Sequence, residues 1–289
     1  MTAIIITGII IVLCILLEIR REMRTFQMTR YTVRSRRLAG MKGTKKILFL
    51  SDLHNQTYGA ENSRLVSAVL REDPDLILLG GDMLVGKRGH SYEPALQFIK
   101  QLAPICPVFY ADGNHEQRVK KRPQEYGLDM DRYVQELGEA GVRFLSNESA
   151  CMELGGIPVR IYGLEIPERC YGHFKRASME AEEITQNIGR RGPDCYNILL
   201  AHNPGYADVY RAWGADFILS GHYHGGIVRI PGIGGLVAPG FFLFPKYSGG
   251  KYEEGDSTIV VSRGLGMHTL PVRLFNPAEV VVLKLKGQQ

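Results

Sequence analysis

The stretch Leu219-Ser220-Gly221-His222-Tyr223-His224-Gly225-Gly226 decides how the rest of the chain is interpreted. The apolar run before it, from 216 to 219, is typical of a buried strand, and it ends at a glycine. Two histidines follow at positions i and i+2, so a strand that ends here delivers two imidazoles to one place. Taken alone, a glycine-rich turn that contains two histidines explains the stretch equally well, because a single pair of histidines has no specific meaning.

Four other apolar runs end in the same way, each followed directly by polar side chains. They are Ser51-Asp52-Leu53-His54, Gly80-Gly81-Asp82, Asp112-Gly113-Asn114-His115-Glu116 and Ala201-His202-Asn203-Pro204. Ligand sites of α/β sheets lie just past the carboxyl ends of the strands. An ordinary turn explains any one segment, but five segments that supply Asp, His and Asn together indicate one site. Carboxylate, imidazole and amide ligands suit divalent metals of intermediate hardness, such as Mn²⁺, Fe²⁺ or Zn²⁺.

Strands and helices are expected to alternate from Lys46 onward. Short apolar runs predict strands over 46–51, 76–79, 107–111, 157–163, 196–201, 217–220, 258–262 and 280–285. Helical patterns cover 61–71, 92–102, 131–140 and 206–213. Because many of the strands are apolar throughout, the sequence predicts an α/β architecture in which helices cover buried sheet.

The order of the five motifs, D-x-H, G-D, G-N-H-E, H and G-H-x-H, resembles that of the calcineurin-like metallophosphoesterases, from about residue 46 to the C-terminus. The resemblance implies a four-layer α/β/β/α sandwich with a site for two metals. It implies two sets of ligands that share one bridging carboxylate: Asp52, His54, Asp82 and His224, and Asp82, Asn114, His202 and His222. It also implies that His115 acts as a general acid or stabilises the transition state, while a metal-bound hydroxide attacks phosphorus.

Departures from known patterns disfavour two branches of this family. Protein Ser/Thr phosphatases carry an arginine soon after the G-D block, where this chain continues Met83-Leu84-Val85-Gly86, and purple acid phosphatases carry a tyrosine at the position of Val85. The apolar N-terminus, the H-N-P block and the tail 262–273 instead resemble a bacterial membrane-associated branch. That branch includes enzymes similar to UDP-2,3-diacylglucosamine pyrophosphatases, so we expect a phosphodiesterase or pyrophosphatase that acts on a lipid-linked or nucleotide substrate.

Two alternatives belong to other functional classes. A non-catalytic, membrane-tethered scaffold with the same fold would be expected to lose ligands or the histidine of G-N-H-E, and all of these are present. The second alternative is a nuclease or a cyclic-nucleotide phosphodiesterase. Of the net charge of +5, residues 18–46 alone carry +8, so residues 47–289 carry −3, which disfavours a long nucleic acid as substrate.

The first 17 residues contain no charge and are rich in Ile and Leu. As a helix, at about 1.5 Å per residue, they would span about 25 Å, near the lower limit for crossing a membrane. A cleaved signal peptide is an alternative, but no basic residue precedes the apolar run; a buried core helix would show polar positions. We expect a single-pass membrane anchor over 1–18, a basic juxtamembrane segment and first strand over 19–45, and a catalytic domain over 46–289. The basic cluster after the apolar run predicts that this domain is cytoplasmic.

Three further residues are candidate substrate contacts: Asn55, Arg263 and His268. Arg263 and His268 belong to a glycine-rich loop, where they either reach a phosphate or lie on the surface, and Asn55 follows His54 directly. The apolar run Phe241-Phe242-Leu243-Phe244 has two interpretations. It forms a lip that contacts acyl chains or the membrane surface, or it is a segment packed on the core. The five dispersed cysteines exclude a C-x-x-C pair and argue against a disulfide framework.

Overall fold

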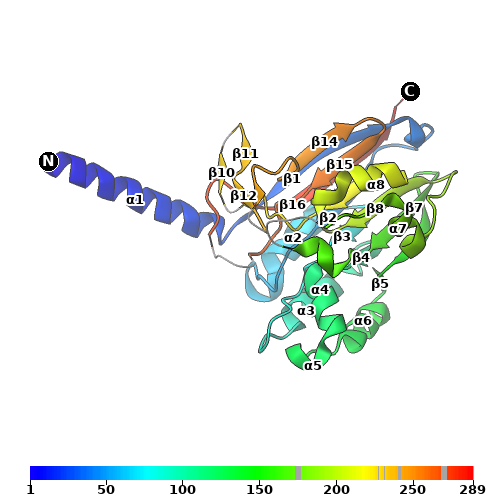
Figure 1. Cartoon of the computed structure of the whole chain (residues 1–289), viewed down its shortest axis with the longest axis horizontal. Coiled ribbons are helices and arrows are strands. Elements are labelled where there is room, and N and C mark those ends of the chain that lie inside the picture. The colour runs from blue at the N-terminus through cyan, green and yellow to red at the C-terminus, as the bar shows by residue number, and fades with distance from the viewer. Residues whose placement is uncertain (173–176, 227, 231, 240–241, 268–271, 289) are drawn as a thin grey trace.

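The computed structural model describes residues 1–172, 177–226, 228–230, 232–239, 242–267 and 272–288. A single helix, α1 (Thr2–Glu22), extends away from a body of packed sheets and helices (Figure 1). The most apolar part of α1 has a mean hydropathy of 2.8, and none of it is buried in the structure. By length and composition, α1 is therefore a candidate membrane span.

The first six-stranded sheet has the strand order β1-β16-β2-β3-β4-β5. Its strands are β1 (Phe26–Ser35), β2 (Lys45–Leu50), β3 (Leu76–Leu79), β4 (Val108–Ala111), β5 (Val142–Leu145) and β16 (Ala278–Gly287). Strands β2 to β5 are parallel to one another, whereas β16 is antiparallel to β2 and parallel to β1. This sheet joins segments from near both ends of the chain.

The second six-stranded sheet has the order β14-β15-β9-β8-β7-β6. Its strands are β6 (Glu148–Leu154), β7 (Ile157–Leu164), β8 (Tyr196–Ala201), β9 (Phe217–Ser220), β14 (Gly250–Glu254) and β15 (Ser257–Val261). The four inner strands are parallel, and the two edge strands are antiparallel to their neighbours. Two small hairpins pair β10 (Arg229–Ile230) with β11 (Gly234–Gly235), and β12 (Val237–Ala238) with β13 (Phe242–Leu243).

Helices connect most of the parallel strands. They are α2 (Ser63–Glu72), α3 (Glu93–Leu102), α4 (Asn114–Lys121), α5 (Pro123–Tyr126), α6 (Met130–Glu139), α7 (Ala181–Ile188) and α8 (Ala207–Trp213). Short 3₁₀ turns lie at Arg36–Leu38, Ala60–Asn62, Glu168–Tyr171 and Pro204–Tyr206.

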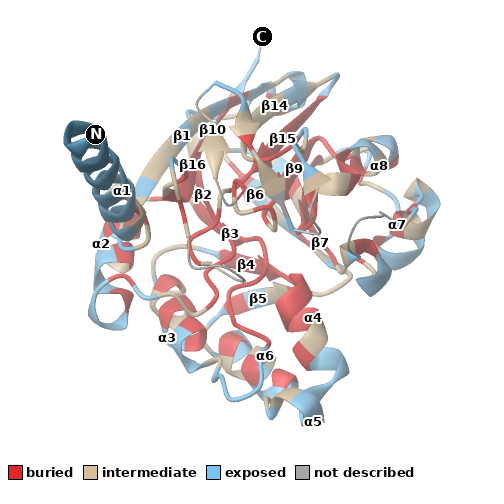
Figure 2. Ribbon diagram, turned by 60° about the vertical axis from the view of Figure 1, so that its left-hand side comes forward, coloured by how far each residue is buried: buried red, intermediate tan, exposed pale blue. Residues whose placement is uncertain are grey.

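Alternate side chains of the buried strands belong to different apolar clusters, one between the two sheets and one between each sheet and its helices. Figure 2 shows buried residues concentrated along the inner strands of both sheets. Leu48 and Leu50 of β2 pack with residues of α2, α3 and α6, whereas Ile47 and Phe49 pack toward the second sheet. Leu199 of β8 lies on the opposite face of the second sheet, where it packs with residues of α7 and α8. The four-layer α/β/β/α sandwich is therefore confirmed.

The predicted strands and helices are all present, with bounds that differ by at most two residues. Within the two large sheets, the sequence missed β5, β6 and β14, and all three are edge strands. Strands β5 and β6 mix buried and exposed positions and β14 has no buried residue, so all three lack the continuous apolar run that identified the inner strands. Helices α4, α5 and α7 were also missed; α4 is strongly polar in composition although half of it is buried.

Candidate functional site

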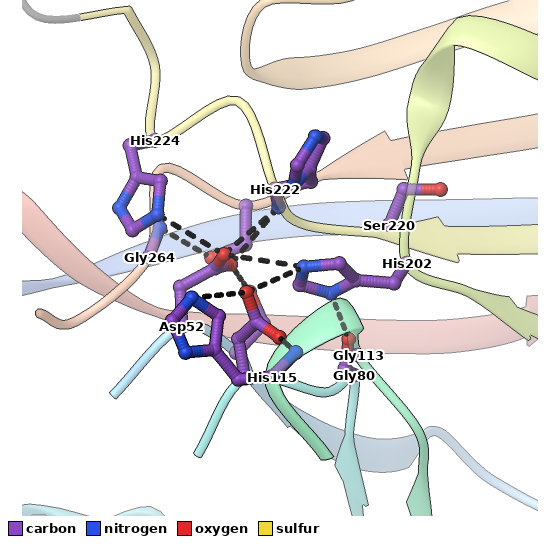
Figure 3. Close-up of polar contacts among 12 residues, drawn as sticks. Asp52, Gly80, Gly113, His115, His202, Ser220, His222, His224 and Gly264 are labelled. Atoms are coloured by element: carbon purple, nitrogen blue, oxygen red, sulfur yellow. Dashed lines mark hydrogen bonds and ion pairs between the residues drawn. The ribbon is translucent and has the colours of Figure 1, made fainter. Parts of the chain in front are cut away.

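The five motifs directly follow β2, β3, β4, β8 and β9, the inner parallel strands of the two sheets. Their side chains gather around the buried carboxylates of Asp52 and Asp82. Figure 3 shows Asp52 together with His202, His222 and His224. Parallel strands present their carboxyl ends at one edge of a sheet, and in this fold the two such edges meet. The structure thus brings the sequence-predicted aspartates and histidines into one cluster.

Ring nitrogens of three histidines lie close to the two carboxylates. His202 Nε2 is 3.2 Å from Asp82 Oδ2 and 3.6 Å from Asp52 Oδ1. His224 Nε2 is 3.3 Å from Asp52 Oδ1 and 3.2 Å from His54 Nε2. Two carboxylates and several imidazoles at this spacing form a set of donors suited to divalent cations of intermediate hardness.

Three groups of side chains offer ligand atoms that all lie within 4.8 Å of one another. They are Asp52, His54 and His224; His54, Asp82 and His115; and Asp82, His202 and His222. Asn114 adds a buried amide oxygen, Oδ1, that accepts no hydrogen bond within the described residues. A buried acceptor without a donor costs free energy, and a cation would satisfy it. These residues therefore fit the metals that the sequence motifs predict.

Two of the histidines are oriented by main-chain carbonyl groups. His202 Nδ1 is 2.7 Å from the carbonyl oxygen of Gly80, and His224 Nδ1 is 3.2 Å from that of Gly266. Because a carbonyl oxygen only accepts, each Nδ1 carries a proton and donates it, so in the neutral ring Nε2 carries a lone pair. In both rings this lone pair faces the carboxylates, as a metal ligand requires.

His115 has the opposite tautomer. Its Nδ1 accepts a hydrogen bond of 2.8 Å from the main-chain N–H of Gly86, so the proton of the neutral ring lies on Nε2. This Nε2 lies 4.0 Å from Asp82 Oδ2, at the cluster. His115 is thus oriented to donate a hydrogen bond from Nε2, whereas His202 and His224 present lone pairs.

The electrostatics of the cluster favour positive charge between the carboxylates. Burial opposes ionisation of Asp82, but the neighbouring histidines, His202 foremost, hold the pKa of Asp82 well below its usual range. Burial also opposes protonation of His202, yet Asp82 and Asp52 raise the pKa of His202 to about 10. Burial lowers the pKa of both His222 and His224, which keeps these rings neutral.

Five of the predicted ligands have backbone conformations in the left-handed region. Their φ angles are +52° for Asp52, +48° for His54, +53° for Asp82, +64° for His222 and +48° for His224. A residue other than glycine in this region costs of the order of 1–3 kcal/mol in conformational free energy. Residues strained in this way are found mostly at functional sites. The surrounding fold therefore holds these side chains in place against a local preference for other conformations.

Two motif glycines are required by close contact with the carboxylates. A Cβ added to Gly113 would lie 2.2 Å from Asp82 Oδ1, and one added to Gly221 would lie 2.1 Å from Asp52 Oδ2. Both distances are far shorter than any real contact of a Cβ atom. The glycines of G-N-H-E and G-H-x-H thus allow the chain to pass directly against the two aspartates.

Glu116, the last residue of G-N-H-E, ties two of the motif loops together. Its carboxylate accepts hydrogen bonds from the main-chain N–H groups of Asp82 (2.8 Å), Met83 (2.9 Å) and Gly113 (2.9 Å), and from the hydroxyl of Tyr110 (2.6 Å). Burial, reinforced by the charge of Asp82, raises the pKa of Glu116 to about 6. The motif G-N-H-E contains Glu116, but the sequence alone gives this residue no role.

The candidate substrate contacts have different surroundings. Asn55 Nδ2 donates to the carbonyl oxygen of Ser91 at 2.7 Å. The guanidinium of Arg263 pairs with the buried carboxylate of Glu279. His268 lies outside the described residues. The roles of these three residues in substrate binding stay predictions.

A buried polar link that the sequence does not reveal joins the G-H-x-H loop to the end of α1. Asn276 Nδ2 donates to the carbonyl oxygen of His224 at 2.7 Å, and the main-chain N–H of Asn276 donates to Glu22 Oε2 at 2.9 Å. Arg273, which is also buried, donates to the carbonyl oxygens of Arg263 and Gly266. The sequence shows Glu22 just after the apolar run, but it shows neither that this carboxylate is buried nor which group it bonds.

The family match and the named relatives agree with the motifs that form this cluster. A family model described as calcineurin-like phosphoesterase matches residues 45–226. Phosphodiesterase YaeI of Escherichia coli (strain K12) is 28% identical over 244 residues, which cover 83% of this chain and 82% of that protein. The uncharacterized metallophosphoesterase YkoQ of Bacillus subtilis (strain 168) is 29% identical over 247 residues, covering 83% and 84%. Among solved structures, phosphopantetheinyl hydrolase from Mycobacterium tuberculosis is 13% identical, with a TM-score of 0.47, over 78% of this chain and 92% of that one.

Proposed function

Because the chain belongs to the calcineurin-like phosphoesterase family and is a phosphoester hydrolase, we propose that it cleaves phosphodiesters with the help of two divalent cations. The observation that supports this most is the convergence of Asp52, Asp82 and the histidine rings on one buried cluster. The name of the relative YaeI, a phosphodiesterase, favours diesters over monoesters. Mn²⁺, Fe²⁺ and Zn²⁺ all suit the donor set.

The ligands divide into two sets. Asp52, His54 and His224 would hold one cation, and Asp82 with His202, His222 and Asn114 would hold the other. Asp82 belongs to two of the three ligand groups, which supports a bridging role for its carboxylate. When bound, the cations supply positive charge that stabilises the transition state and lower the pKa of a coordinated water.

His115 has a separate task in this proposal. The N–H of Gly86 fixes the proton of His115 on Nε2, beside the cluster. From there the neutral ring of His115 would donate a hydrogen bond from Nε2 to a phosphoryl oxygen as the phosphoester bond breaks. General-acid action would need a second proton on Nδ1, which already accepts a hydrogen bond from the N–H of Gly86. Asp82 Oδ1 accepts a hydrogen bond of 2.8 Å from the main-chain N–H of His115. This bond fixes the position of His115 relative to Asp82, the proposed bridging ligand.

The test is hydrolysis by the full chain in detergent, first stripped of metal and then refilled with Mn²⁺. An aryl phosphodiester is offered beside the matching monoester. We expect cleavage of the diester that requires metal, disappears in Asp82→Asn and persists in Asp131→Asn, an exposed aspartate on α6. If the wild-type chain binds metal but leaves the diester intact, or if Asp82→Asn stays active, the proposal is wrong.

The proposal extends to the substrate class and to the side of the membrane. We infer that α1 anchors the chain and that the substrate is a lipid-linked phosphodiester or diphosphate, since the G-H-x-H loop is bonded through Asn276 to Glu22 at the end of α1. The assignment to the UDP-2,3-diacylglucosamine branch stays a prediction. The basic residues Arg20, Arg21 and Arg24 favour a cytoplasmic catalytic domain.

The exposed thiol of Cys151 on β6 offers a test of sidedness. A membrane-impermeant maleimide added to intact cells should leave this thiol unlabelled and should label it after lysis. Labelling in intact cells would place the domain outside. A Cys151→Ser chain serves as the control for reaction at other thiols.

A further inference from the structure

Exposed large apolar side chains are scarce on the body of this protein. Within the described residues and outside α1 they are Leu70, Ile233, Leu243, Phe244 and Phe275. Leu70 belongs to α2, whereas the other four come from the hairpins β10–β11 and β12–β13 and from the segment before β16. We call Ile233, Leu243, Phe244 and Phe275 the apolar rim. Their exposed fractions run from 53% to 69%, so this rim lies open to its surroundings.

Hydrogen bonds connect the rim to the end of α1 step by step. The Glu22 carboxylate accepts a hydrogen bond from the main-chain N–H of Asn276, the residue directly after Phe275. Leu274, directly before Phe275, accepts a hydrogen bond from the N–H of Arg229 in β10. Leu236 in turn donates to Val228 and accepts from Phe244. Figure 1 shows β10, β11 and β12 at the same end of the body as the last turn of α1.

Two of the rim residues have strained backbones. Phe244 and Phe275 have φ angles of +47° and +55°, in a region that large side chains rarely adopt. Each is more than half exposed, so no burial in the described structure offsets this strain. A contact outside the chain would offset this strain and cover the exposed rings.

The neighbouring helix indicates what covers the rim. Helix α1 has 21 residues, which at about 1.5 Å per residue give a length near the ~30 Å of a bilayer's hydrocarbon core. Its last turn carries Arg20 and Arg21, followed by Arg24, and these suit an anionic headgroup layer. Phe275 lies next to this turn through the bond to Glu22, at the level where aromatic residues gather in membrane proteins.

We propose that the apolar rim is a second membrane contact, which inserts into the interface of the bilayer crossed by α1 and holds the Asp/His cluster beside the lipid headgroups. The occupant is a lipid bilayer with anionic headgroups. This inference rests on the proposed anchoring by α1 and not on the proposed hydrolysis. Since His224 is bonded through Asn276 to the same helix end, the cluster would meet phosphoesters at the membrane surface.

The experiment measures the insertion of single tryptophans in the full chain, reconstituted in vesicles of zwitterionic and anionic lipids. Phe244→Trp, Phe275→Trp and Leu70→Trp are compared with the parent chain, whose one tryptophan, Trp213, is buried on α8. Binding to the vesicles should blue-shift the added emission at 244 and 275, and replacing part of the lipid with brominated lipid should quench it. The added emission of Leu70→Trp and that of the parent should stay unchanged.

Two results would overturn the inference in distinguishable ways. If the chain fails to float with the vesicles, anchoring by α1 is wrong and the rim has no bilayer to meet. If the chain floats but Phe244→Trp and Phe275→Trp are quenched no more than Leu70→Trp, anchoring stands and the second contact is wrong. Neither result depends on hydrolysis, so the proposed activity is tested separately.

Discussion

Substitution of Gly113 by alanine tests the geometry of the cluster with the addition of a single methyl group. The φ of Gly113 is −99°, a value that alanine adopts without strain, so the effect is steric alone. The new Cβ would lie 2.2 Å from Asp82 Oδ1 and 2.4 Å from Asp82 N. Relief of these contacts requires a shift of about 1 Å in Asp82 or in the G-N-H-E loop. Misplacement by about 1 Å costs about 10²-fold in rate, and overpacking costs about 1–3 kcal/mol in stability.

The assay is kcat/KM for an aryl phosphodiester in the presence of Mn²⁺, together with the free energy of unfolding in urea. Gly138→Ala is the matched control, because a Cβ at Gly138 in α6 meets nothing within 4 Å. That variant should keep full activity and gain up to about 1 kcal/mol, since alanine favours a helix over glycine. Activity of Gly113→Ala within threefold of wild type would refute the close contact with Asp82 on which this reasoning depends.

Three further outcomes are expected. Glu116→Gln replaces one acceptor oxygen by a donor, so at least two buried N–H groups lose their hydrogen-bond acceptor. At about 1–3 kcal/mol for each group, the free energy of unfolding in urea should fall by about 2–6 kcal/mol. An unchanged urea midpoint would contradict the role of Glu116. Asn276→Ala removes the donor to the carbonyl oxygen of His224 and to that of a nearby glycine. At about 1 kcal/mol each, the thermal midpoint should fall by about 4–8 °C, and a midpoint within 1 °C of wild type would contradict it. Burial raises the pKa of the Cys106 thiol to about 12, so about one molecule in 10⁴ carries the reactive thiolate at pH 8. Iodoacetamide should therefore label the exposed Cys151 and leave Cys106 unmodified until urea unfolds the chain.

The core of the site could be predicted because each motif is local in sequence. An apolar run and the polar residues after it lie within about ten positions, so one stretch encodes both a strand and the ligands that the strand presents. The inner strands carry this signal most clearly: β2 and β8 appear within one residue of their predicted bounds. Where a strand lies at a sheet edge, as β5 and β6 do, exposed positions interrupt the run and the signal is lost.

Interactions between distant parts of the chain could not be predicted. Glu22 and Asn276 are 254 positions apart, and no local pattern pairs them. Glu116 is visible within G-N-H-E, but its hydrogen bonds to the main chain after β3 require the register of two parallel strands. The type of Arg263 suits either a phosphate contact or a surface position, and its pairing with Glu279 could not be predicted because it depends on where β16 enters the first sheet.

The central claim is that two divalent cations bind at the Asp/His cluster and share Asp82. Its most direct test is the number of metal ions per chain, determined by elemental mass spectrometry on the full chain after stripping, refilling with Mn²⁺ and removal of the excess. The account predicts two Mn²⁺ per wild-type chain and at most one in Asp82→Asn, with Asp131→Asn equal to wild type. No bound metal in the wild-type chain, or two ions retained in Asp82→Asn, would contradict it.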